Sequence, residues 1–228
     1  MADAAVTAAH AECLGNEAAL WPWISRFLWS PAPDLHPSRR ESLLPGWPSQ
    51  VWSDQRALKH VSRHLLSSHG LLETPSYDSS AEGFLLALLP QAPLACLARR
   101  AGMALHGIEA CESLPFLDED DRNFLIKRVP LYWHVQPVHG GDPEATGWQV
   151  LRLLTAAQPD ALQRRFTWKT PLDPGQPSGH PLGHPGGTLP GAALLNGLIR
   201  KVLKEFESPW SSLFAALRRP GCQIRLHG

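Results

Sequence analysis

Apolar residues recur along much of the chain at the three- or four-residue spacing that places them on one face of a helix. The clearest row follows Pro93, a residue that a helix accepts in its first turn. Apolar and polar residues never alternate one by one, as they do in a strand, over more than about five residues, so a large sheet is not expected. We therefore expect an all-α protein, with helices over residues 16–29, 53–68, 93–107, 118–129, 142–157, 159–166 and 192–206. Ser53 is the expected N-cap of the second of these helices.

Proline and glycine interrupt this pattern and limit the lengths of the helices. The 228 residues include 22 prolines and 18 glycines, and 12 of the 21 residues from 171 to 191 are one or the other. Such a stretch cannot bury much apolar area and is expected to be mobile. We expect a flexible N-terminal segment at 1–16, followed by a single irregular helical domain over 17–228 that carries a mobile Pro/Gly-rich loop at 171–191.

The apolar rows also predict the core of this domain. Each predicted helix of the central and C-terminal parts contributes large aliphatic or aromatic side chains to one face. The expected core includes Leu94, Leu97, Ala101, Leu105, Phe124, Trp148, Leu151 and Leu198.

Composition and charge exclude several classes of protein. The chain has 21 basic and 21 acidic residues. It lacks an apolar run close to the roughly 20 residues of a membrane helix, so direct membrane insertion is not expected. A secretory signal is not expected either, because residues 1–5 carry an acidic residue where such a signal has Lys or Arg, and no apolar stretch follows. Residues 158–228 hold nine basic and four acidic side chains, but nucleic-acid-binding domains are usually strongly basic overall. We expect a cytoplasmic protein that does not bind nucleic acid.

No group of residues has the spacing of a metal site. The four cysteines contain no CxxC pair, so neither a zinc site nor a disulfide framework is indicated. His60 and His64 are four residues apart, which would place both imidazoles on one helical face. They lie opposite the apolar row of this helix (Leu58, Val61 and Leu65) and beside three cationic residues (Arg56, Lys59 and Arg63). The positive charges of these neighbouring side chains disfavour the binding of a metal ion. We interpret this region as a solvated polar face and assign no metal ligands.

The sequence contains no catalytic motif either. The acidic run at 118–121 is interpreted as the start of a helix, where negative charge interacts favourably with the helix dipole. A GxSxG elbow, a P-loop and a GxGxxG loop are all absent. We therefore expect a protein that is not an enzyme, with no catalytic or cofactor-binding residues and no cofactor.

The predicted helix at 192–206 has two contrasting sides. Its apolar row occupies one side, and Arg200, Lys201 and Lys204 project from the other, where few acidic residues of the same helix neutralise them. These cations form either a solvated face or a docking face for an acidic surface of a partner, since complementary charge speeds encounter and fixes orientation.

The stretch FLLALLPQAPLACLARRAGMALHGIEAC (84–111) resembles the central region of the SctK/YscK family, the cytosolic accessory proteins of bacterial type III secretion systems. The shared element is a Leu-rich start, a helix with Arg, and then Gly-x-x-Leu-His-Gly, here Gly102, Leu105, His106 and Gly107. A following helix ends at a proline and a tryptophan, here Pro130 and Trp133. The segments LHPSRRESLLPGW, GWQVLRLLTAAQPDALQRRFTWKTPL and LLNGLIRKVLKEFESPWSSLF are similar to further family segments, so the resemblance covers residues 20–217 in patches. The Pro/Gly-rich stretch at 171–191 departs from the family by its length.

The resemblance implies a non-enzymatic adaptor of the cytoplasmic sorting platform. Such an adaptor links the cytosolic domain of the inner-membrane ring protein (the D component) to the pod-forming Q component, and indirectly to the L subunit and the ATPase, at the cytoplasmic face of the inner-membrane secretion apparatus. The family has no catalytic residues to transfer. We expect Gly102 to permit close helix approach, Leu105 to fill the core and Gly107 to turn the chain, and we expect His106, in the last turn, to interact favourably with the helix dipole.

Two other classes of function stay open at this point. One is a metal-dependent hydrolase whose His and Asp residues are dispersed in sequence but gathered in space. The other is a helical regulator or nucleic-acid-binding protein that uses its basic C-terminal part, whose binding would depend steeply on salt.

Overall fold

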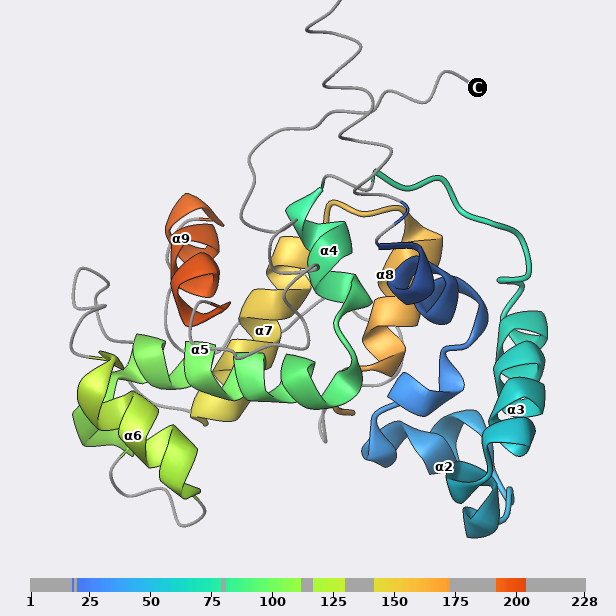
Figure 1. Cartoon of the computed structure of the whole chain (residues 1–228), viewed down its shortest axis with the longest axis horizontal. Helices are drawn as coiled ribbons and strands as arrows, with labels where there is room; N and C mark the ends of the chain where they lie inside the picture. The colour runs from blue at the N-terminus through green and yellow to red at the C-terminus, as the bar shows by residue number, and fades with distance from the viewer. Residues whose placement is uncertain are drawn as a thin grey trace, which may run out of the picture. The chain divides into compact units, whose positions relative to one another are not determined.

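A computed structural model of the chain describes residues 18, 20–78, 81–111, 117–129, 142–172 and 192–203 (Figure 1). These described residues are mostly helical, and none of them belongs to a strand. The all-α prediction is confirmed. The flexible segment expected at 1–16 lies outside the described residues, as does the Pro/Gly-rich loop beyond Leu172.

Short turns come early in the described chain, and longer helices follow them. Residues 20–29 are helical, and three 3-10 turns and a set of α-helices follow. The 3-10 turns are η1 (Ala32–Asp34), η2 (Pro37–Arg39) and η3 (Ser49–Ser53). The α-helices are α2 (Arg40–Leu43), α3 (Gln55–Ser68), α4 (Glu82–Leu88), α5 (Gln91–Cys111), α6 (Glu119–Lys127), α7 (Pro143–Thr155), α8 (Asp160–Trp168) and α9 (Ala192–Leu203).

The chain divides into two compact units. Unit 1 comprises Met1–Gln91, Thr155–Pro171 and Glu207–Gly228, and unit 2 comprises Ala92–Leu154 and Leu172–Phe206. Each unit is therefore assembled from segments that are far apart in the sequence. The single domain expected over 17–228 stays a prediction.

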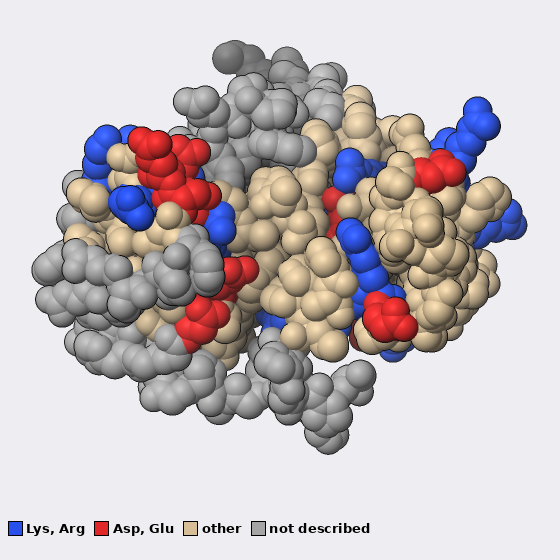
Figure 2. Space-filling model, turned by 90° about the horizontal axis from the view of Figure 1, so that it is seen from below, with Lys and Arg blue, Asp and Glu red and all other residues tan. Residues whose placement is uncertain are grey.

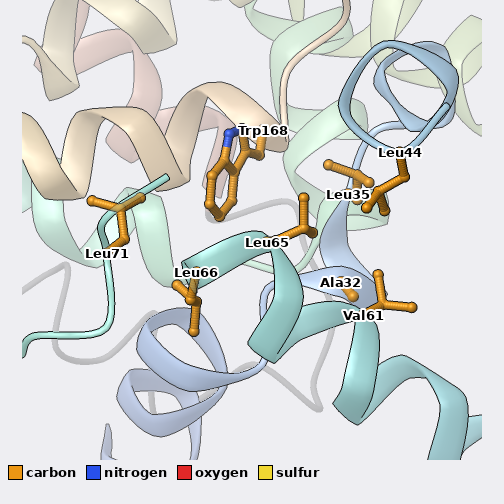
Figure 3. Packing of buried hydrophobic residues seen from close by; sticks show 8 residues of the cluster. All are labelled: Ala32, Leu35, Leu44, Val61, Leu65, Leu66, Leu71 and Trp168. Carbon is orange, nitrogen blue, oxygen red and sulfur yellow. The ribbon is translucent and has the colours of Figure 1, made fainter. Parts of the chain in front are cut away.

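A cluster of aliphatic side chains around Trp168 forms a core of unit 1 (Figure 3). The cluster joins the turn region before α3, the inner face of α3 and the end of α8. Its buried members are Ala32, Leu35, Leu44, Val61, Leu65, Leu66, Leu71 and Trp168. Val61 and Leu65 belong to the apolar row that predicts the helix, which explains why α3 presents this face inward.

The N-cap of α3 differs by one residue from the sequence-based expectation. Ser53 was the expected cap, but its hydroxyl donates to the carbonyl of Gln50 in the preceding 3-10 turn. Asp54 takes the position instead, and its carboxylate accepts a hydrogen bond from the backbone N–H of Arg56 at 2.8 Å. The prediction of Ser53 as the cap was wrong, because Ser and Asp can both cap a helix and the Ser53 hydroxyl is already hydrogen-bonded within the preceding turn.

Unit 1 also buries two cations from α8 and the residue that follows it. The guanidinium of Arg165 donates to the carbonyls of Leu28, Leu71 and Ala161. The Lys169 ammonium donates to the carbonyls of Ala87 and Leu89 at the end of α4, and lies 5.2 Å from the centre of the Phe27 ring. Burial lowers the pKa of Arg165 to about 10 and that of Lys169 to about 8. Both side chains therefore remain mainly protonated at neutral pH and donate to carbonyls of other segments, and Arg165 donates in addition to Ala161 in its own helix.

Unit 2 is built on α5, α6, α7 and α9. All eight residues predicted for the core lie in this unit, and each has a relative exposure of 4% or less. The prediction of these core positions is confirmed. Asp118 caps α6 by accepting a hydrogen bond from the N–H of Asp121, and Asp142 accepts one from the N–H of Ala145 at the start of α7. Both helix starts agree with the sequence-based interpretation.

Candidate functional site

Two glycines bring α5 and α7 of unit 2 into backbone contact. A Cβ atom added at Gly102 would lie 1.7 Å from the carbonyl oxygen of Pro143, and one added at Gly147 would lie 1.7 Å from that of Ala98. Neither position can accept a side chain unless the helices move apart. The crossing of α5 and α7 is visible in Figure 1. Gly147 was missed by the sequence analysis, although an isolated glycine inside a helical pattern often has such a packing reason.

The Gly-x-x-Leu-His-Gly residues extend along α5 from this crossing. Leu105 is buried in the core, and His106 is only 4% exposed. Gly107 has φ 78° and ψ 178°, which breaks the helical geometry and bends α5 at this point. A residue with a side chain rarely adopts this positive φ, so glycine is the residue suited to the bend.

His106 links α5 to the first turns of α7. Its Nε2 atom lies 2.9 Å from the Thr146 hydroxyl oxygen, and the same hydroxyl donates to the carbonyl of Asp142 at 3.1 Å. Because the single hydroxyl proton is used toward Asp142, Nε2 of His106 is the donor in the pair. The four motif residues thus combine a close helix crossing, a core side chain, a buried hydrogen bond and a bend.

A buried carboxylate joins α6 to α5. Asp121 is 1% exposed and lies 2.6 Å from Nε of Arg99 and 3.2 Å from Nε of Arg100. The Arg100 guanidinium also lies 5.3 Å from the centre of the Phe124 ring. The acidic run at 118–121 therefore starts a helix, as the sequence indicates, and in addition supplies the counter-ion for two arginines. This pairing was missed because the partners are about twenty positions apart.

The structure gives the proposed docking face of α9 only in part. Arg200 is exposed and Lys201 is half-buried, and each interacts with another group. Lys204 lies outside the described residues. The opposite side of α9 is buried through Leu195, Leu198, Ile199 and Val202, which fixes the direction in which Arg200 points.

Among the residues that the structure describes, the histidines and cysteines form no metal-binding group. The imidazole of His64 packs on Trp47 with ring centres 5.4 Å apart, and His60 is exposed. Cys96 and Cys111 are free thiols, and burial raises the pKa of Cys111 to about 11, which keeps it protonated at neutral pH. Across the part of the chain that the structure describes, no group of three or more His, Cys, Asp or Glu side chains could hold a metal ion.

Among the described helices, none combines the length and the apolar character that crossing a membrane requires.

No protein-family model, curated protein or solved structure matches the chain.

Proposed function

We propose that this chain is a non-enzymatic adaptor of a type III secretion sorting platform. In this proposal it links the cytosolic domain of the inner-membrane ring protein to the pod-forming subunit, and through the pod to the L subunit and the ATPase. It would act at the cytoplasmic face of the inner-membrane secretion apparatus. The ordered resemblance of residues 20–217 to the SctK/YscK family is the basis of the proposal.

The single observation that supports it best is the construction of unit 2 around the motif residues. Gly102 lies at a backbone contact between two helices, and His106 forms a buried hydrogen bond to the second of them. Each of the four motif residues has a distinct structural role in unit 2, which a generic Leu-rich helix would not require.

Co-purification tests the proposal directly. The full chain is co-expressed with the ring protein's cytosolic domain and the pod subunit from the same genome, and the mixture is separated by size-exclusion chromatography. We expect one complex that contains all three proteins. Absence of both partners from the fraction that holds the folded chain would contradict the proposal. Stoichiometric metal that is lost when His60 and His64 are replaced would support the hydrolase instead.

The α9 cations supply a more specific version of the test. Reversal of Arg200, Lys201 and Lys204 to Glu is expected to leave the helical circular dichroism spectrum intact, slow association and flatten its salt dependence. The matched control reverses Arg122, Lys127 and Arg164, which are exposed cations on α6 and α8. An equal loss of association in both variants would show that only net charge matters and would remove the α9 face from the proposal.

A further inference from the structure

The outer face of α3 carries cations and no acidic residue. Arg56, Lys59 and Arg63 follow one another at spacings of three and four residues, so they lie on one side of the helix, and all three are exposed. The sequence of α3 contains no Asp or Glu. Within the described part of the chain, none of the three cations forms an ion pair. His60 and His64 are exposed on the same helix. We call Arg56, Lys59 and Arg63 the α3 basic face.

The interior contacts of α3 hold this face in a fixed direction. Val61, Leu65 and Leu66 are buried in the core of unit 1. Ser62 is 1% exposed, and its hydroxyl accepts a hydrogen bond from the backbone N–H of Ala32 at 3.1 Å. In Figure 2, Lys and Arg side chains project on the side of the picture where α3 lies in Figure 1, and a few Asp and Glu side chains of the surrounding surface lie among them.

A pocket of about 300 Å³ opens beside the α3 basic face. Its walls come from the helix at 20–29, the turn η1 and the first half of α3, all within unit 1. Pro22, Pro33 and Leu58 supply apolar surface, and Lys59 belongs both to the pocket and to the basic face. The charge of Arg26, which also lines the pocket, is matched by Asp34 through two hydrogen bonds of 2.8 and 2.7 Å. Lys59 is therefore the cation left to attract a ligand.

We propose that the α3 basic face and this pocket bind an acidic segment of a partner protein. The three cations extend over two helical turns, about 10 Å, which is longer than a small anion but suits several successive carboxylates of a peptide. The pocket with its apolar walls suits one side chain of that peptide, with Lys59 placed to pair with a neighbouring carboxylate. A protein is favoured over nucleic acid because the chain as a whole has no net charge, whereas nucleic-acid-binding domains are usually strongly basic.

This surface is defined by unit 1 alone and goes beyond the adaptor proposal, so the two are tested separately. The probe is a fluorescein-labelled Glu-rich peptide that contains spaced leucines, and its binding to the full-length chain is measured by fluorescence anisotropy at several salt concentrations. We expect binding that weakens with salt. Reversal of Arg56, Lys59 and Arg63 to Glu should weaken it by about tenfold or more, because like charges then face the peptide.

Two further variants separate this site from a general charge effect. Reversal of Arg122, Lys127 and Arg164 makes the same change in net charge away from α3, and it should alter the affinity by less than about threefold. Ser25→Trp places a bulky side chain in the pocket without changing the charge, and it should also weaken binding. Circular dichroism checks that each variant is folded. Equal weakening by the two reversals, tighter binding of a thymidine oligonucleotide of the same charge, or no binding of the peptide would each overturn the proposal.

Discussion

Unit 2 and unit 1 achieve close packing by different means. In unit 2, two glycines allow α5 and α7 to touch, and predicted apolar residues fill the space around them. Unit 1 also has an apolar cluster, but it additionally buries the charged ends of Arg165 and Lys169 against backbone carbonyls. The comparison teaches that an apolar pattern reveals the aliphatic and aromatic part of both cores but not their buried charged groups, such as Asp121 in unit 2 and Arg165 in unit 1.

The lengths of the elements explain this difference. The two helices that cross in unit 2 have 21 and 13 residues, so most of their carbonyls are satisfied within the helix. Unit 1 contains three 3-10 turns and the short helices α2 and α4, which leave carbonyls near many element ends. Lys169 reaches the carbonyls at the end of α4, whereas Arg165 bonds those of Leu28, in the last turn of the helix at 20–29, and of Leu71, just after α3. These hydrogen bonds offset part of the cost of burying the charge.

The largest effect is expected at the crossing in unit 2. Gly102→Leu forces a side chain into the backbone of Pro143 and should lower the free energy of unfolding by about 3 kcal/mol or more. Gly197→Ala in α9 is the control, because a Cβ there has no neighbour within 4 Å, and it should be neutral or stabilise by up to about 1 kcal/mol. Urea denaturation measures both. Similar stabilities for the two variants would contradict a packing role for Gly102.

The corresponding test in unit 1 compares two adjacent arginines. Arg165→Met removes the donor to three carbonyls and should destabilise the protein by about 2–3 kcal/mol. Arg164→Met removes only an exposed pair with Asp160, and its effect on the free energy of unfolding should stay below about 0.5 kcal/mol. Equal effects in urea denaturation would show that the buried hydrogen bonds of Arg165 contribute nothing specific.

The pH dependence of stability sharpens the comparison further. Burial lowers the pKa of Lys169 from 10.5 to about 8, so between these pH values the unfolded chain binds more protons than the folded chain. Stability contributed by this group therefore rises with pH across that window, by at most about 1.4 kcal/mol per pH unit. In Lys169→Met this contribution should disappear, which is measured as the difference between the two proteins in urea denaturation at pH 7.5 and above. A constant difference would place the pKa outside this window.

The smallest effect is expected at the hydrogen bond between α5 and α7. A double-mutant cycle with His106→Ala and Thr146→Val should give a coupling energy of about 1 kcal/mol, since the pair is buried. The single variants should keep the helical spectrum. Additive effects on stability would indicate that the contact does not contribute to the packing of unit 2.

Local features of the fold could be read from the sequence because they depend on neighbouring residues. Asp118 and Asp142 are followed by the helices that they cap, and the apolar spacing identifies the inner faces of α5, α7 and α9. Helix α5 begins at Gln91, two residues before the predicted start, and ends at Cys111, four residues beyond the predicted end, because the chain resumes a helical path after the bend at Gly107. The choice between Ser53 and Asp54 as a cap could not be made, because it depends on the turn before them.

The sequence by itself determined the helical class and the core positions of unit 2, through interactions that repeat every three or four residues. Only the tertiary structure decided which distant groups meet. His106 and Thr146 are 40 positions apart, and Arg165 and Leu71 are 94 positions apart. The pocket beside Lys59 likewise needs the helix at 20–29 to lie against α3. Such contacts carry no local periodicity, because a side chain's hydrogen-bonding partner is set by the path of the whole chain.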